Sequence, residues 1–210
     1  MNNLILDCSC GMNIYLQKGE EIFLFEDKIQ NKHSDEVLKN IDDLLNKASL
    51  KVSDIKNFCV CVGPGSFTGV RVAVSVVKGL AIGVCADVYA LTNFDIFFDG
   101  IENSVLILDG FSNFVYVRKR QNGAVRDFCI EIDKIVNEIE LENLKVYHTT
   151  EKMQNLLKKY GIDSEFVKSD IVSSFNKKIE RSEKTELNMI LPVYLRASQA
   201  EIEREKKKNG

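Results

Sequence analysis

The residues best placed to do chemistry form a glycine-rich loop before an apolar helix. The stretch GPGSFTGVR follows the apolar run FCVCV and leads into a helical pattern over 67–85. Free N–H groups and the positive dipole end at a helix N-terminus suit an anion such as phosphate. Ser66 is placed to cap this helix, and Arg71 could supply a positive charge. The candidate anion-binding or nucleotide-proximal residues are therefore Gly63, Gly65, Ser66, Thr68, Gly69 and Arg71.

The two common phosphate-binding motifs are both incomplete here. A P-loop needs G-x-x-x-x-G-K-[ST], but Gly65 and Gly69 are one residue too close and Val70 replaces the lysine. A dinucleotide-binding loop needs G-x-G-x-x-G, but the third glycine of Gly63, Gly65 and Gly69 comes one residue late. Because glycine has no side chain, the alternative is that the loop lets backbone approach backbone. We favour packing or a protein interface over phosphate binding, and contact with an anion stays open.

The helix after the loop has a row of small residues beside a row of bulky ones. The small row is Ser75, Gly79 and Gly83, and the apolar row is Val72, Val76, Leu80 and Val84. A glycine inside a helix costs about 1 kcal/mol relative to alanine, so two of them need a reason. Close contact with another helix would supply that reason.

Other catalytic or metal-binding patterns are weak. Six cysteines include two C-x-C pairs, but zinc sites usually use C-x₂₋₄-C spacing, and Cys59 and Cys61 lie in a run typical of a buried strand. The two histidines, His33 and His148, cannot form a local pair, and no H-E-x-x-H is present. We therefore predict no metal site, no catalytic residue and no peptidase activity.

Composition is typical of a globular protein. The 210 residues are 45% hydrophobic, with a net charge of −3 and a pI near 5.6, so any contact with nucleic acid is local or made through a partner. The first residues lack the basic and apolar regions of a signal peptide, and charged residues interrupt the apolar run over 70–91. We expect a cytoplasmic protein without a membrane span.

The sequence pattern predicts alternating strands and helices. Strands are expected at 3–8, 12–18 and 20–27, with a hairpin at Gly19 between the last two. An amphipathic helix should run from a cap at Ser34 to residue 48. A strand at 58–62, the helix over 67–85, a strand at 87–91 and a helix opened by Thr92 complete the first half.

The strand pattern of the first residues then recurs in the second half of the chain. LILD at 4–7 recurs at 106–109, IYL at 14–16 is echoed by VYV at 115–117, and the offset is 101 or 102 residues. This repeat predicts a duplicated β-meander and two α/β lobes, at 1–100 and 101–210, with a charged tail from about 198.

GPGSFTGVR, KGLAIG, LILDCS and LPVYLR together resemble the TsaB (formerly YeaZ) family of bacterial tRNA threonylcarbamoyladenosine biosynthesis. The resemblance implies a duplicated actin-like fold of the sugar-kinase and Hsp70 superfamily with two βββαβα-type lobes. It implies a scaffold that binds the transferase TsaD, with the ATPase TsaE joining, ATP or ADP near the interface, and tRNA reached through the complex. Its interface helices would be 34–48 and 67–85. The residues expected there are Val37, Leu38, Ile41, Leu45, Val72, Ser75, Val76, Gly79 and Gly83.

Departures from the catalytic paralogue favour a subunit without chemistry of its own. Thr92 and Ile96 stand where TsaD has two metal-binding histidines, and the turns after Asp7 and Asp109 each contain one glycine. The alternative is an actin-like ATPase or kinase in which Asp7 and Asp109 hold magnesium through water. Alone, an apolar helix face often pairs with its own copy, so we expect a weak homodimer.

Overall fold

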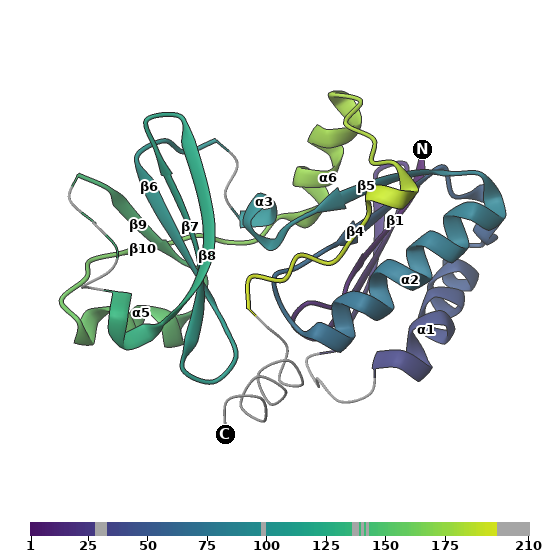
Figure 1. Ribbon diagram of the computed structural model, residues 1–210. Helices are drawn as coiled ribbons and strands as arrows, with labels where there is room; N and C mark the ends of the chain where they lie inside the picture. The colour runs from purple at the N-terminus through teal and green to yellow at the C-terminus, as the bar shows by residue number, and fades with distance from the viewer. Residues whose placement is uncertain (28–32, 98–99, 136–138, 140, 142, 197–210) are drawn as a thin grey trace, which may run out of the picture. The chain divides into compact units, whose positions relative to one another are not determined.

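The computed structural model describes residues 1–27, 33–97, 100–135, 139, 141 and 143–196. The chain divides into two compact units (Figure 1). Unit 1 comprises Met1–Ile96 and Asp170–Val193, and unit 2 comprises Phe97–Ser169 and residues 194–196 of the described chain. The predicted assignment of everything from 101 to 210 to the second lobe is therefore wrong for 170–193. The charged tail from 198 lies outside the described residues.

A five-stranded mixed sheet forms the centre of unit 1, in the order β3-β2-β1-β4-β5. Its strands are β1 (Asn2–Asp7), β2 (Met12–Lys18), β3 (Glu21–Asp27), β4 (Asn57–Cys61) and β5 (Asp87–Leu91). β1, β2 and β3 are antiparallel neighbours, and β4 and β5 continue parallel to β1. The predicted hairpin is confirmed, because Lys18 pairs with Glu21 across Gly19, whose φ of +62° suits glycine.

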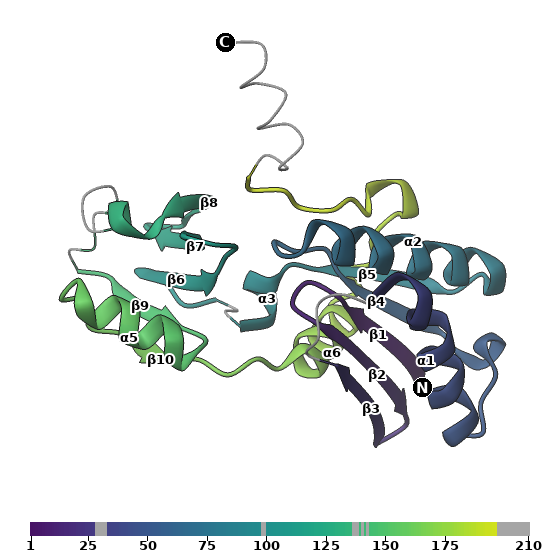
Figure 2. The ribbon, with the colours of Figure 1, turned by 90° about the horizontal axis from the view of Figure 1, so that it is seen from below.

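Helices α1 (His33–Lys47) and α2 (Phe67–Val84) lie side by side on one face of this sheet (Figures 1 and 2). Their apolar residues pack on strand residues such as Leu4, Leu6 and Ile14. A short 3₁₀ turn, η1 (Val52–Asp54), precedes β4. α1 begins one residue before the predicted cap Ser34, whose side chain lies outside the described ones.

The returning segment 170–193 contributes to both faces of the same sheet: its helix covers the face opposite α1 and α2 (Figure 2), whereas Leu187, Ile190 and Val193 pack into the core beside α2. It contains α6 (Ile171–Glu180) and the 3₁₀ turn η3 (Leu187–Met189). The Phe175 ring of α6 meets Tyr89 of β5 edge to face, with centroids 5.4 Å apart. Beyond α6, the amide of Thr185 donates to the Val88 carbonyl at 2.8 Å, and that of Val193 to Val62 at 2.7 Å. This segment thus completes unit 1.

Unit 2 repeats the architecture with a second five-stranded sheet, in the order β10-β9-β6-β7-β8. Its elements, with the α3 helix that leads into it, are α3 (Asn93–Phe97), β6 (Ser104–Asp109), β7 (Phe114–Gln121), β8 (Ala124–Glu131), η2 (Ile132–Lys134), β9 (Lys145–His148), α5 (Glu151–Lys159) and β10 (Glu165–Phe166). Thr150 caps α5 by accepting from the Met153 amide at 3.2 Å, and Gly161 follows its end with φ +71°, as predicted. The two sheets share one strand order, so the duplicated α/β fold is confirmed.

The offset at which the repeated strands match in structure differs from the offset at which their residues are identical. Leu4 and Leu6 point into the core beneath α1 and α2, but the matching core residues of unit 2 are Val105 and Ile107. The residues identical in sequence, Leu106 and Leu108, lie on the opposite side of β6 from the core that α5 covers. A shift of one residue along a strand reverses every side chain. The structural offset in these strands is therefore 101, and the LILD identity at 102 is out of phase.

His148 should make the stability of unit 2 depend on pH. It is 1% exposed and its Nδ1 has no hydrogen-bond partner within the described part of the chain. Burial, and then the charge of Lys158, lowers the pKa of His148. The unfolded state then binds a proton more readily, so stability should fall as pH drops below about 6.5.

The measurement is the urea midpoint at pH 7.5 and pH 5.5. We expect His148→Phe, which keeps an aromatic ring beside Phe166, to lose part of the fall in midpoint shown by the wild type. An unchanged fall in the His148 variant would contradict the assignment.

Candidate functional site

The glycine loop lies between β4 and α2 and is packed against the turn that follows β1. A Cβ at Gly65 would lie 2.5 Å from the Ser9 carbonyl oxygen, and one at Gly69 would overlap the Cys8 carbonyl oxygen. The amide of Ser66 donates to the Ser9 carbonyl at 2.8 Å. These contacts give Gly65 and Gly69 a packing role, because no side chain fits between the two backbone segments.

Ser66 caps α2 as its position in the sequence suggests. Its Oγ accepts from the Gly69 amide at 3.2 Å. The amides of Ser66 and Gly69, which an anion at this helix end would use, thus have acceptors within the protein. Gly63 has φ +97°, a conformation that favours glycine. Thr68 and Arg71 are exposed on the first turn of α2, so weak anion contact there stays a prediction.

Asn93 joins the loop to the turn after β1. Its Nδ2 donates to Ser9 Oγ at 2.8 Å and to the Pro64 carbonyl at 2.7 Å. The Cys61 thiol donates to Asn93 Oδ1 at 3.4 Å. No sequence motif marks Asn93, whereas Thr92, predicted to open the next helix, does accept from the Asp95 amide at 3.2 Å. The loop is therefore a fixed platform for the start of α2.

The predicted interface residues of α1 divide by face. Val37, Ile41 and Leu45 are buried in the core of unit 1, so their prediction as partner contacts is wrong. Their helical spacing reflects packing on the sheet beneath α1. Leu38 is 57% exposed and remains available to a partner.

The outer side of α2 carries the small-residue row. Ser75, Gly79 and Gly83 are exposed, and a Cβ at Gly79 or Gly83 would meet nothing within 4 Å. Val72 and Val76 are half-buried beside them. Ile82, which sequence analysis missed, is 62% exposed. We call Ser75, Gly79, Ile82 and Gly83 the α2 stripe.

Beyond Arg71, the exposed residues of α2 are Ser75, Gly79, Ile82 and Gly83, so this part of its uncovered side carries no charge. By length and composition α2 could cross a membrane, with a mean hydropathy of 1.6, yet it packs on the sheet and a third of its residues are buried in this chain. A surface helix of a globular unit usually has a polar outer face. The uncovered apolar side of α2 is therefore a candidate contact surface.

Asp7 and Asp109 do not occupy equivalent positions. Asp7 points away from the core under α1 and α2, and its Oδ1 accepts from the Ser9 amide at 2.8 Å. Asp109 lies on the α5 side of its sheet, where Thr150 donates to Oδ2 and Lys152 Nζ lies 3.3 Å from Oδ1. The matched pair of acidic turns that would motivate magnesium binding is absent from the described chain.

The cysteines of β4 lie inside the fold, as the FCVCV pattern predicts. Burial raises the pKa of the Cys59 and Cys61 thiols, and burial with the nearby Asp7 charge raises that of Cys8 to about 12. Because a metal binds the thiolate, these environments disfavour zinc. Within the described ranges, no three His, Cys, Asp or Glu side chains gather as a metal site.

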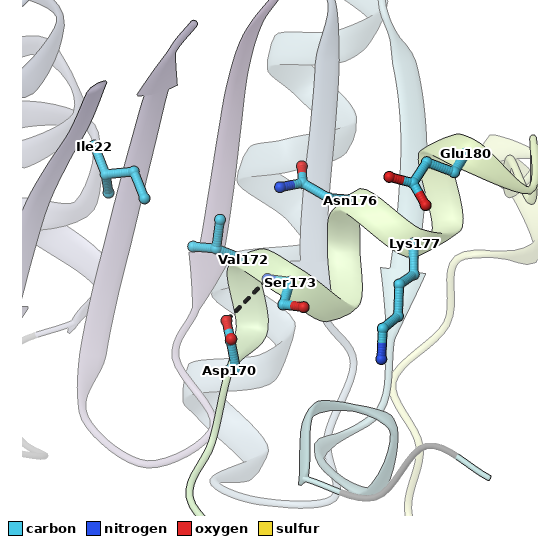
Figure 3. Close-up of a pocket in the computed structure, with 7 residues that line it drawn as sticks. All are labelled: Ile22, Asp170, Val172, Ser173, Asn176, Lys177 and Glu180. Atoms are coloured by element: carbon cyan, nitrogen blue, oxygen red, sulfur yellow. Dashed lines mark hydrogen bonds between the residues drawn. The ribbon is translucent and has the colours of Figure 1, made fainter. Parts of the chain in front are cut away.

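A shallow hollow lies on the α6 side of unit 1 (Figure 3). Ile22 of β3 faces it from one side, and from α6 and its cap it is lined by Asp170, Val172, Ser173, Asn176, Lys177 and Glu180. Asp170 Oδ1 accepts from the Ser173 amide at 2.9 Å, so this carboxylate serves as the helix cap. The lining contains no histidine or cysteine that could form a nucleophile–base pair.

Comparison with known proteins identifies a matching family and several relatives of this chain. Residues 27–144 match the family model of TsaD, tRNA N6-adenosine threonylcarbamoyltransferase. The chain is 32% identical over 122 residues to the tRNA threonylcarbamoyladenosine biosynthesis protein TsaB of Haemophilus influenzae, covering 54% of this chain and 51% of that protein. TsaB of Buchnera aphidicola from Acyrthosiphon pisum is 31% identical over 90 residues, 40% of this chain and 39% of that protein. The matches thus span 51% and 39% of the lengths of these two relatives.

Solved structures agree on the fold. YeaZ from Pseudomonas aeruginosa superposes with a TM-score of 0.72 at 22% identity, covering 92% of this chain and 99% of that one. A protein described as an N-acetylglucosamine kinase from Porphyromonas gingivalis gives 0.50 at 9% identity, covering 86% and 99%. The fold is thus the actin-like one predicted. The family match and the named relatives lead to one conclusion: the chain belongs to the TsaD family and, within it, to the TsaB (YeaZ) group.

Proposed function

We propose that this chain is a non-catalytic cytoplasmic subunit that binds the transferase TsaD through the α2 stripe. In that complex it would support threonylcarbamoylation of adenosine 37 in tRNAs that read ANN codons, with the ATPase TsaE as a further partner. The observation that carries the proposal is the exposed, apolar and glycine-containing side of α2.

The shape of the stripe suits a helix partner. At Gly79 and Gly83 the helix backbone is bare, so another helix can approach more closely than it could over larger side chains. Ile82 on α2 and Leu38 on α1 add exposed apolar area. Such area is stabilising when a partner removes it from water. The two glycines weaken the helix by about 1 kcal/mol each, a cost that contact with a partner would offset.

The actin-like ATPase or kinase alternative has less support from the residues. Its expected magnesium ligands, Asp7 and Asp109, face different ways relative to their helices, and Asp109 is paired with Lys152. Contact with ATP or ADP near the TsaD interface remains part of the proposal, with Thr68 and Arg71 as candidate residues. ATP turnover by the isolated chain that Asp7→Asn abolishes would favour the alternative.

The test is light scattering on a sizing column, with the chain alone and mixed with TsaD from its own organism. We expect a weak homodimer that gives way to a one-to-one complex. Gly79→Leu should weaken both by roughly thirtyfold or more, because it places a side chain where backbones would meet. Asn155→Leu is the matched control, since it adds leucine to an exposed position on α5 of unit 2.

The possible outcomes distinguish a loss of partner binding from a loss of folding. A Cβ at Gly79 meets open space, so the variant should keep the wild-type circular dichroism spectrum. If wild type binds TsaD and Gly79→Leu binds as tightly as Asn155→Leu, the stripe is not the interface. If no complex forms with or without ATP, the scaffold proposal fails.

A further inference from the structure

The sheet of unit 1 has two outer strands, and the described chain covers the edge of only one of them. On the outer side of β5, the Thr185 amide donates to the Val88 carbonyl at 2.8 Å, and the Ala90 amide donates to Thr185 Oγ1 at 3.1 Å. At the other end of the sheet, β3 pairs with β2 alone among the described strands (Figure 2). An unpaired strand edge is a template for another extended chain.

The register of the hairpin shows which backbone groups of β3 face outward. Lys18 pairs with Glu21 across a two-residue turn, and the pair that flanks such a turn exchanges both of its hydrogen bonds. Hydrogen-bonded and non-hydrogen-bonded pairs then alternate along an antiparallel ladder. The N–H and C=O groups of Ile22, Leu24 and Glu26 therefore point away from β2. These donors and acceptors form a row without a backbone partner in the described chain.

β3 lacks most of the features that usually protect an exposed edge strand. Such strands are commonly short, interrupted by a bulge, or marked by lysine or proline. β3 has seven residues in unbroken pairing with β2 and contains neither lysine nor proline. Its outer face is apolar, because Ile22 is 51% exposed and Leu24 is 47% exposed, whereas Phe23 and Phe25 face the core beneath α1. In unit 2, β10 has only two residues and β8 carries charged residues in its middle.

Acidic side chains stand at both ends of this apolar strand. Glu20 and Glu21 are exposed at its start, and Glu26 is exposed near its end. If two copies of β3 paired antiparallel about their centres, the acidic start of each would meet the acidic end of the other. Like charges in directly opposed positions are destabilising, whereas a strand with basic ends would meet opposite charges. The edge therefore disfavours a second copy of β3 and favours a basic partner strand.

We propose that the outer edge of β3 binds an extended segment of a partner protein, with apolar residues in its middle and basic residues at its ends. The segment would extend the five-stranded sheet of unit 1 by one strand. Main-chain hydrogen bonds supply affinity when a peptide adds to a sheet edge, and its side chains supply specificity. Here the apolar side chains would cover Ile22 and Leu24, and the basic ends would face the glutamates. The inference goes beyond the proposed function, because the β3 edge shares no residue with the α2 stripe.

The test measures the binding of two fluorescein-labelled peptides to the full chain by fluorescence anisotropy. The lysine peptide is KKVTVTVKK, and the glutamate peptide, EEVTVTVEE, has the same middle with acidic ends. We expect the lysine peptide to bind roughly tenfold more tightly at low salt, because several exposed charge pairs of modest strength act together. Added salt should reduce this preference. If neither peptide binds, the glutamates only protect the edge and the inference fails.

Reversal of the edge charges distinguishes a change in binding from a loss of folding. Glu21→Lys with Glu26→Lys should reverse the preference, so that the glutamate peptide binds more tightly. A loss of folding would weaken the binding of both peptides without reversing their order. The matched control is Glu36→Lys with Asp43→Lys, which makes the same change in charge at exposed positions of α1. The control should keep the preference for the lysine peptide, and equal behaviour of the two double variants would overturn the inference.

Proline at position 24 tests the backbone contact. The Leu24 N–H points outward, so Leu24→Pro removes a donor from the open edge and none from the ladder with β2. Leu24→Ala is the control, because it shortens the side chain but keeps the N–H. We expect the proline variant to bind the lysine peptide roughly tenfold more weakly than the alanine variant does. Equal binding by the two variants would contradict the addition of a strand.

The sizing experiment with TsaD keeps this inference distinct from the proposed function. Leu24→Pro should still form the complex, and Gly79→Leu should still bind the lysine peptide. If Leu24→Pro also loses the complex, the β3 edge belongs to that interface and the inference of a separate site fails. If Leu24→Pro instead loses the homodimer, the occupant is a second copy of this chain and the partner inference fails.

A third peptide tests whether the chain occupies its own edge. It consists of residues 197–210, which contain a lysine run at 206–208. We expect it to bind the β3 edge more weakly than the lysine peptide does, because it lacks the alternating apolar residues of a strand. Tighter binding than that of the lysine peptide would assign the edge to this segment and overturn the partner inference.

Discussion

Alanine at Gly69 should destabilise unit 1 by about 3 kcal/mol, the upper end of the usual cost of overpacking. The added Cβ would overlap the Cys8 carbonyl oxygen, and the same position lies 3.3 Å from Ser66 Oγ. The severe clash is with the Cys8 carbonyl oxygen, which belongs to the backbone. It therefore cannot be relieved by the rotation of a flexible side chain. The measurement is the free energy of unfolding in urea, followed by circular dichroism.

The same substitution at Gly79 should act in the opposite direction. Gly79 lies in the same helix, but its added Cβ would meet open space, so alanine should stabilise the fold by up to about 1 kcal/mol through helix propensity. Gly79→Ala is thus the matched control for Gly69→Ala. Equal effects at the two positions would contradict the packing role of the loop.

Removal of the Asp127 carboxylate should destabilise unit 2 by about 3 kcal/mol, because Arg118 is only 8% exposed and would lose a bidentate partner. Asp127→Ala is the test variant, and the denaturation midpoint is the readout. The value is placed at the lower end of the range for buried pairs, since the Asp127 side chain is 24% exposed.

A double-mutant cycle separates this pair from its surroundings. Replacing both partners, with Arg118→Met and Asp127→Ala together, should cost less than Asp127→Ala alone, because no buried charge is left without its carboxylate. Glu131→Ala is the control, since its pair with Lys134 is exposed on both sides and should contribute less than about 1 kcal/mol. If the Asp127 and Glu131 variants are equally stable, the bidentate pair does not support the fold.

Features set by local chemistry could be predicted from the sequence. The hairpin at Gly19, the Ser66 cap and the buried FCVCV strand depend on neighbouring residues, and the structure confirms all three. The packing role of Gly65 and Gly69 could be proposed but not established, because the partner surface at Cys8 and Ser9 is more than 50 residues away in the chain.

Features set by long-range contacts could not be predicted. Periodicity identifies the apolar side of α1 but does not show whether a sheet or a partner covers it, so the sequence pattern predicts the wrong surface for Val37 and Ile41. The LILD repeat has the same limit. Identical letters at a slip of one residue point to opposite faces, and pairing with β7 rather than similarity decides the phase. Asn93 carries no motif, and its importance comes from the loop it joins.

The return of 170–193 to unit 1 has a consequence for how the chain folds as it is made. Residues 97–169 of unit 2 are inserted within unit 1, so the first unit lacks α6 and the residues that pair with Val88 and Val62 until residues 170–193 have left the ribosome. Unit 2 has its main strands and α5 by residue 169. Domains generally fold as units during synthesis, from the N-terminus onward. This chain departs from that order, because the main strands and α5 of unit 2 are made before the N-terminal unit has α6.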